Sequence, residues 1–162
     1  MLKRSLLIIT IVISCVGCDQ STKILAKNAL SQSDTISLFD DVFRLEYIEN
    51  KGAFLSMGSE LSEDIRYLVL VPGIGLMMLL FAAYLLLNNG ISNLVLVAYS
   101  MILAGGIGNL ADRVFNHGAV VDFLNVGIGS VRTGIFNFAD LFIVIGVAIA
   151  IIASLYKTQR PT

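Results

Sequence analysis

Four apolar runs are spaced along the chain, and polar segments of different lengths separate them. Their lengths and composition predict helices over the following ranges: about 5–25, 67–87, 91–110 and 137–156. The second run has about 21 residues, enough to cross a hydrocarbon core of ~30 Å at about 1.5 Å per residue. Asn88-Asn89-Gly90 is typical of a tight turn, so the third helix is expected to return antiparallel to the second.

The two longer polar segments, about 28–66 and 112–134, are expected to lie outside the membrane. In the first, Phe43, Leu45 and Tyr47 alternate with charged residues, a period of two that predicts a short strand. The predicted fold is an all-α membrane protein with four transmembrane helices and a small extracytoplasmic β-subdomain on the bilayer surface. A chain of this length is expected to form a single domain over residues 1–162.

Composition supports the membrane class and excludes others. Of the 162 residues, 56% are hydrophobic and 14% are charged, and the mean hydropathy is +0.83, which is too apolar for an ordinary soluble domain. The net charge of −1 leaves no basic surface for nucleic acid, so that partner is not expected. The single histidine, His117, lies outside any H-E-x-x-H motif, and neither a metal nor a cofactor is expected.

Basic residues near both ends predict the orientation in the membrane. Lys3 and Arg4 precede the first helix, and Lys157 and Arg160 follow the last. Because basic residues in short flanks favour the cytoplasmic side, both termini are expected in the cytoplasm and the two longer polar segments on the outer side.

Polar side chains on three predicted helices converge at one depth. Counting from the cytoplasmic ends at about 1.5 Å per residue puts Asp19 roughly 22 Å, Asp140 roughly 24 Å and Asn109 roughly 27 Å into a core of ~30 Å. Taken singly, Asp19 and Asp140 are equally well explained as groups that snorkel or cap a helix near the interface. Ionisable groups inside a membrane are costly, however, and their convergence favours a functional site.

Asp122 and Asp140 are the natural acid–base pair, because apolar residues surround each of them in the sequence. Two carboxyl groups held close in a low-dielectric site share one proton, and this is the chemistry of aspartic peptidases. Asn50, Asn109 and Asn137 are expected to hold such a pair or to orient a substrate.

Arg113 has several possible roles. It is expected to pair with Asp112, to bind a backbone or headgroup oxygen, or to act as a plain interfacial anchor. Ser21 and Lys23 do not indicate a Ser–Lys hydrolase, since i,i+2 neighbours on a helix do not face each other.

The first apolar run has two other interpretations. Cys15 and Cys18 form a C-x-x-C pair, but without a second cysteine pair they fit small buried hydrophobes better than a redox or metal site. Val16-Gly17-Cys18 resembles a lipobox, which predicts a lipoprotein whose mature chain starts at Cys18. Against this, position 15 is not Leu, and three more apolar runs follow.

Intramembrane carboxylates leave other classes open, namely a small transporter or proton-coupled channel, or a purely structural membrane partner. A transporter predicts aspartates spread through the depth of the bundle, whereas here they cluster towards one face.

Five stretches carry a resemblance to a known family: Asp19 to Lys23, Asn50 to Phe54, Gly105 to Arg113, Val120 to Phe123, and Phe136 to Asp140. The chain resembles the lipoprotein signal peptidases, or signal peptidase II, over nearly its whole length, and GGIGNLADR and FNFAD are the most specific motifs. The resemblance implies an intramembrane aspartic endopeptidase that removes signal peptides from diacylglyceryl-modified prolipoproteins by cleaving before the lipidated cysteine. The expected protein is a monomer in the bacterial cytoplasmic (inner) membrane, with its active site towards the outer face and with lipidated prolipoproteins and membrane lipids as partners.

The same resemblance assigns the site. Asp122 and Asp140 match the catalytic pair, no metal is implied, and the other polar site positions are Asp19, Asn50, Asn109, Arg113 and Asn137. The chain departs from the family at Phe54, which replaces a second alanine, at Gly134-Ile135, where a proline is usual, and in having no tryptophan. These departures leave open a paralogue with altered preference. The acidic loop after the first helix is expected to act as a lid, with Phe54, Leu55 and Met57 as its apolar contacts.

Overall fold

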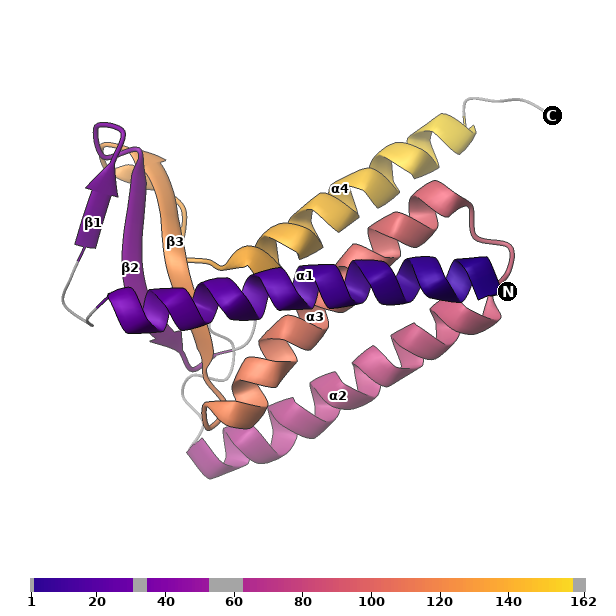
Figure 1. Cartoon of the computed structure of the whole chain (residues 1–162), viewed down its shortest axis with the longest axis horizontal. Coiled ribbons are helices and arrows are strands. Elements are labelled where there is room, and N and C mark those ends of the chain that lie inside the picture. The colour runs from indigo at the N-terminus through magenta and orange to yellow at the C-terminus, as the bar shows by residue number, and fades with distance from the viewer. Residues whose placement is uncertain (1, 31–34, 53–62, 159–162) are drawn as a thin grey trace.

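The computed structural model describes residues 2–30, 35–52 and 63–158, in which four helices lie side by side and a small sheet covers one end of them (Figure 1). The helices are α1 (Leu2–Ala29), α2 (Glu63–Leu87), α3 (Asn93–Phe115) and α4 (Phe138–Thr158). The strands are β1 (Thr35–Leu38), β2 (Phe43–Asn50), β3 (Val120–Ile128) and β4 (Val131–Arg132).

Three of these helices are long and apolar enough to cross a membrane, over the spans Tyr67–Leu87, Asn93–Phe115 and Phe138–Tyr156. Within the described ranges α1 does not qualify as a fourth such helix, so the prediction of four transmembrane helices is supported for three of them. The uncharged stretch of α1 between Arg4 and Asp19 covers only about 21 Å of helix, less than a core of ~30 Å.

The ends of the helices differ from the apolar runs. α1 continues past Asp19 and Lys23, because these charges bond to groups on other elements instead of ending the helix. α3 extends beyond residue 110 and carries Asp112 and Arg113 close to its end. α2 contains Pro72 without a break in the helix, which membrane helices tolerate.

All four strands form one antiparallel sheet in the order β1-β2-β3-β4. The strand predicted around residues 43–47 is confirmed as part of β2. The sequence does not indicate β3, because Val120 to Phe123 are all buried and the run lacks a period of two. The register pairs Ile48 with Asp122 and Asn50 with Val120, which brings two candidate site residues to neighbouring strands.

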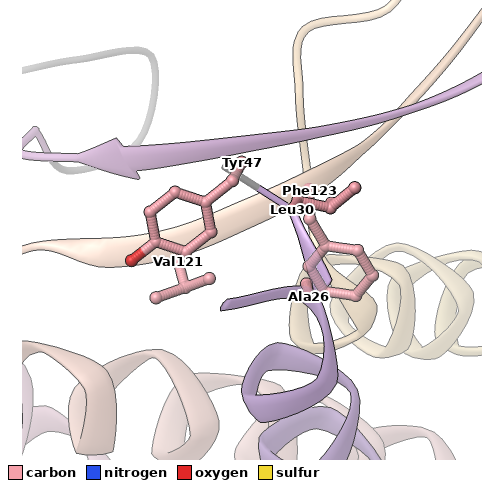
Figure 2. Packing of buried hydrophobic residues seen from close by; sticks show 5 residues of the cluster. All are labelled: Ala26, Leu30, Tyr47, Val121 and Phe123. Atoms are coloured by element: carbon pink, nitrogen blue, oxygen red, sulfur yellow. The ribbon is translucent and has the colours of Figure 1, made fainter. Parts of the chain in front are cut away.

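A buried apolar cluster joins the sheet to the end of α1. Its members are Ala26, Leu30, Tyr47, Val121 and Phe123. Figure 2 shows these side chains, which come from α1, β2, β3 and the residue after α1, grouped between the sheet and the helix. Burying an aliphatic or aromatic side chain of this size contributes about 1.5–3 kcal/mol, so the cluster fixes the sheet on the helices.

Close packing of α3 against α4 depends on small residues. A Cβ at Gly105 would collide with the carbonyl oxygen of Ala139, and one at Gly146 would lie 2.6 Å from the carbonyl oxygen of Ala98. Small residues therefore let the two backbones approach closely.

The N-terminal end of α1, the α2–α3 turn and the last turn of α4 lie at the end of the bundle opposite the sheet (Figure 1). The Arg4 guanidinium donates hydrogen bonds to the carbonyl oxygens of Leu85, Asn88 and Ile91 at 3.1, 2.6 and 3.2 Å. α1 is thereby fixed to the α2–α3 turn.

Candidate active site

The start of α4 holds Asp140 through reciprocal bonds with Asn137. Asn137 Oδ1 accepts a hydrogen bond from the backbone N–H of Asp140 at 3.0 Å, and Asp140 Oδ2 accepts one from the backbone N–H of Asn137 at 3.1 Å. This is the arrangement of a capping box, and Asn is a preferred N-cap residue. A carboxylate in the first turn also suits the positive end of the helix dipole. The local sequence thus fixes both side chains at the start of α4.

β3 places Asp122 next to this helix start. Its Oδ1 accepts a hydrogen bond from Asn137 Nδ2 at 2.7 Å, and its Oδ2 accepts one from Asn50 Nδ2 at 3.0 Å. Asn50 is the last residue of β2, and its Oδ1 accepts from the backbone N–H of Gly52 at 3.0 Å, which fixes the direction of its amide. Asp122 is 3% exposed, so both carboxylate oxygens are satisfied inside the protein.

Asn137 connects the two carboxyl groups. It donates from its side chain to Asp122 and from its backbone to Asp140, and it is fully buried. Asn109 Nδ2 donates to the other Asp140 oxygen, Oδ1, at 2.8 Å. Asn137 Nδ2 also lies 3.1 Å from Asn109 Oδ1. Three asparagines therefore surround the carboxyl pair and direct their amide hydrogens at it.

Burial raises the pKa of Asp122 to about 6, because apolar surroundings disfavour its charged form. The hydrogen bond from Asn50 lowers that pKa, since it stabilises the carboxylate, and the charge of Asp140 raises it. Interacting carboxyl groups titrate as a pair. Asp122 can therefore hold a proton at mildly acidic pH.

Lys23 sets the direction of the Asn109 amide. Its Nζ lies 3.1 Å from Asn109 Oδ1, so that Nδ2 of the same amide points at Asp140. The Nζ also lies 2.8 Å from Asp19 Oδ2 and 2.9 Å from Asp112 Oδ2. Lys23 is 3% exposed, and these three acceptors match the three hydrogens of an ammonium group.

Asp19 and Asp112, the two carboxylates that bind Lys23, also bond to the backbone next to Asp140 and Asp122. Asp19 Oδ1 accepts a hydrogen bond from the backbone N–H of Ala139, in the first turn of α4, at 2.9 Å. Asp112 Oδ2 accepts one from the backbone N–H of Val121, which precedes Asp122, at 3.0 Å. Gln20 Nε2 donates to Asp112 Oδ1 at 2.9 Å. This buried network fixes the start of α4 and the start of β3 to α1 and α3.

The interpretation of Arg113 as an interfacial anchor is wrong, because the side chain is buried under the end of β2. Its Nη2 donates to the carbonyl oxygen of Gly52 at 3.0 Å and its Nη1 to that of Asn109 at 3.1 Å. The backbone-oxygen alternative is the one observed. Asp112, the other expected partner, bonds to Lys23 and Gln20.

The structure brings the predicted site residues into one connected group: Asp19, Asn50, Asn109, Arg113, Asp122, Asn137 and Asp140. Lys23, Gln20 and Asp112 belong to the same group, although the predicted site lacks them. For Lys23 the sequence does hold a signal: Asp19 and Lys23 are i,i+4 neighbours, so they lie on one helix face and can form an ion pair. The expected lid contacts lie outside the described residues: Phe54, Leu55 and Met57.

Chemically, a carboxyl pair that shares a proton can activate a water molecule and protonate a carbonyl oxygen. Among residues 2–30, 35–52 and 63–158, no cluster of three or more His, Cys, Asp or Glu side chains is arranged to hold a metal ion.

Apolar membrane helices that carry a buried Asp122 and a half-buried Asp140 beneath a small sheet indicate an integral membrane enzyme. The sequence matches the family described as signal peptidase (SPase) II over residues 11–156. The chain therefore belongs to the signal peptidase II family.

Relatives and solved structures agree with this membership. Lipoprotein signal peptidase of Borreliella burgdorferi (strain ZS7) is 35% identical over 160 residues, covering 94% of this chain and 92% of that protein. That of Fusobacterium nucleatum is 36% identical over 143 residues, covering 88% and 82%. A bacterial membrane enzyme solved by the in meso method at 2.3 Å resolution superposes with a TM-score of 0.80 at 26% identity, covering 96% of this chain and 91% of that one. A second such structure, at 1.9 Å, gives 0.76 at 27% identity, covering 91% and 92%.

Proposed function

We propose that this protein is an intramembrane aspartic endopeptidase that removes signal peptides from diacylglyceryl-modified prolipoproteins, cutting the peptide bond before the lipidated cysteine. The observation that carries the proposal is the joining of Asp122 and Asp140 through Asn137. Family membership supports a peptidase, and two carboxyl groups held close together are the site that an aspartic mechanism requires.

In the proposed mechanism the pair begins with one shared proton. The ionised carboxyl takes a proton from water, whose oxygen attacks the scissile carbonyl carbon, and the protonated carboxyl gives its proton to the carbonyl oxygen. The tetrahedral diol then loses its C–N bond, the proton taken from water passes to the leaving amine of the cysteine, and the pair recovers one proton from a diol hydroxyl. One water is consumed for each peptide bond cut.

The asparagines act as positioning residues in this scheme. Each of the four carboxyl oxygens of the pair accepts one hydrogen bond from an asparagine, from Asn50, Asn109 or Asn137. Donors fixed before the substrate arrives cost little reorganisation during the reaction. Their bonds hold the two carboxyl groups in one geometry without neutralising them.

We also propose that α1 is a fourth membrane crossing, with both termini in the cytoplasm and the site towards the outer face of the bacterial inner membrane. Arg4 ties the start of α1 to the α2–α3 turn, while Asp19 reaches the start of α4 at the other end of the bundle. The basic residues Lys3 and Lys157 flank the end opposite the sheet, as expected for a cytoplasmic side.

The surroundings of the site suit a lipidated substrate. α2 and α4 expose large apolar side chains along their length, such as Leu79 (71%) and Val144 (64%), and these faces contact lipid in a membrane protein. A peptide anchored by diacylglycerol would approach such a site sideways from the bilayer.

The testing experiment is cleavage of a diacylglyceryl-modified prolipoprotein by purified protein, with Asp122→Asn and Asp140→Asn alongside and Asp40→Asn as a matched exposed-acid control. We expect a cut before the lipidated cysteine with wild type and Asp40→Asn, and none with the two site variants. An active site variant, or an inactive wild type, contradicts the proposal. Two measurements test the lipoprotein alternative. Retained cleavage by Cys18→Ser, together with a wild-type chain that mass spectrometry shows to begin at Met1, excludes it.

A further inference from the structure

The end of the sheet farthest from α3 carries an exposed apolar surface. At the β1–β2 turn Phe39 is 77% exposed, and at the β3–β4 turn Ile128 and Val131 are 79% and 80% exposed. The two turns are adjacent, since the backbone N–H of Gly127 donates to the carbonyl oxygen of Val42 at 2.9 Å. We call this surface the apolar tip, and its members are Phe39, Phe43, Ile128 and Val131.

The course of the chain places the apolar tip beyond the edge of the helices. Leu124 on β3 pairs with Phe136, two residues before α4 begins. Ile128 lies four strand residues further along, or roughly 13 Å, whereas the radius of a helix with its side chains is about 5–6 Å. In Figure 1 the strands run steeply across the direction of the helices, and this end extends away from them. The tip therefore extends sideways beyond the start of α4, towards the region that lipid occupies around a membrane-spanning α4.

The β1–β2 turn holds Phe39 in an unusual backbone. Phe39, Asp40 and Asp41 have φ angles of 54°, 52° and 69°, in a region that a bulky residue rarely adopts. The Asp41 carboxylate accepts hydrogen bonds from Arg44 Nε and Ser37 Oγ, both at 2.7 Å, and these bonds hold its pKa well below its usual range. Such strain persists where the surroundings impose it and is concentrated in functional segments.

Charges next to the apolar tip compensate one another. Asp40 and Asp41 on the turn are matched by Arg44 and Arg132, and Arg132 Nη1 donates to the backbone oxygen of Asp41 at 2.7 Å. The rim of the tip therefore has no net charge to attract nucleic acid or a strongly charged protein. An apolar surface with a compensated polar rim fits the boundary between headgroups and acyl chains of a phospholipid layer.

We propose that the apolar tip inserts into the phospholipid interface beside α4 and holds the sheet on the bilayer. The occupant is the lipid layer that α4 itself enters, and zwitterionic phospholipid is sufficient because the rim is neutral. This role is separate from the proposed peptidase activity, since it needs only the membrane location of the helices and the position of the sheet.

The sequence contains no tryptophan, so a single introduced tryptophan reports on its own surroundings. Phe39→Trp, Ile128→Trp and Val131→Trp would each be made in the full-length protein and reconstituted into phosphatidylcholine vesicles. Phosphatidylcholine brominated on its acyl chains quenches a fluorophore in the lipid, and aqueous iodide quenches one in water. Leu79→Trp, on the exposed side of α2, is the membrane reference, and Thr35→Trp, at the other end of edge strand β1, is the sheet control.

The tip variants are expected to be quenched by brominated lipid to within about twofold of Leu79→Trp and to be shielded from iodide, whereas Thr35→Trp responds mainly to iodide. Iodide quenching of the folded tip variants, with no response to brominated lipid, shows that the tip stays in water and overturns the proposal. Shielding that appears only after a prolipoprotein is added also overturns it, because the surface then binds protein. The helical circular dichroism signal identifies which variants are folded. A single folded tip variant is enough to decide between these outcomes.

Discussion

The ammonium group of Lys23 on α1 lies 3.1 Å from the side-chain oxygen of Asn109 on α3, and the amide nitrogen of Asn109 donates to Asp140 on α4. One buried cation therefore orients a donor to a candidate catalytic carboxyl on another helix. Asp19 and Asp112 supply the opposite charges that make its burial tolerable. The buried ion pairs of Lys23 and the hydrogen bonds to the carboxyl pair therefore belong to one network.

Lys23→Met is expected to destabilise the protein and abolish cleavage. The substitution leaves the carboxylates of Asp19 and Asp112 buried without a counter-charge, and breaking a buried pair in this way costs about 3–5 kcal/mol. Lys27→Met is the matched control, because Lys27 lies one turn further along α1 and is exposed. Thermal unfolding in detergent and prolipoprotein cleavage measure both effects. Equal melting temperatures for the two variants would show that the network does not stabilise the fold.

Asn137→Ser separates the capping of α4 from the bridge between the carboxyl groups. Serine is also a preferred N-cap and can accept from the backbone N–H of Asp140, but it has no amide to donate to Asp122. We expect a fall in kcat of about 10²–10³-fold, as for loss of one preorganised donor, with a stability change of well under about 2 kcal/mol.

The matched variant is Asn137→Ala, which loses both functions and is expected to melt at a lower temperature than Asn137→Ser. If Asn137→Ser keeps wild-type kcat, the bridge from Asn137 to Asp122 is not needed for the reaction.

The common level of three site residues along the helices could be predicted from sequence, because the rise of an α-helix is nearly constant. Counting residues brings Asp19, Asn109 and Asp140 to one level, and in the structure they belong to one hydrogen-bonded group. The strand at residues 43–47 could be predicted because apolar and charged residues alternate there in the sequence. The burial of β2 does not follow this alternation, since Phe43 is exposed although Tyr47, on the same face, is buried.

The rotation of each helix about its axis and the pairing of strands and helices distant in sequence could not be predicted in this way. β3 is buried on both faces near Asp122, so its sequence lacks alternation. The backbone bonds from Ala139 to Asp19 and from Val121 to Asp112 join elements far apart in the chain. Asp19 ends the first apolar run in the sequence, but α1 continues to Ala29. The helix can continue because Asp19 has buried partners, which the sequence does not reveal.

Activity is expected to fall as pH rises through about 6, the value to which burial raises the pKa of Asp122. The carboxyl pair needs one shared proton, and this proton is lost on the alkaline side of that value. In Asn50→Ala the Asp122 carboxylate loses a hydrogen bond that lowers its pKa, so the alkaline limb is expected to move to higher pH. The pH profiles of kcat for the two proteins measure the shift. A limb that stays in place or moves to lower pH contradicts the role given to Asn50.

Gly108→Ala is expected to disrupt the site from within α3. An added Cβ would lie 2.7 Å from Asp19 Oδ2 and 3.3 Å from the Ala139 side chain, so either the Asp19 carboxylate or the start of α4 must move. Because Asp19 holds both Lys23 and the backbone of Ala139, movement there changes the positions of Asn109 and Asp140. We expect loss of most cleavage activity and a destabilisation of about 1–3 kcal/mol, the usual cost of overpacking.

Gly17→Ala is the matched control for that substitution. Gly17 lies in α1, and among the described residues no atom outside the backbone of α1 itself lies within 4 Å of an added Cβ. Alanine is favoured over glycine in a helix by about 1 kcal/mol. The control is therefore expected to keep full activity and to melt at the same or a higher temperature. If Gly108→Ala behaves like Gly17→Ala in both cleavage and thermal unfolding, the close approach of α3 to Asp19 does not constrain the site. If only Gly108→Ala loses activity, the spacing between these elements controls the geometry of the carboxyl pair.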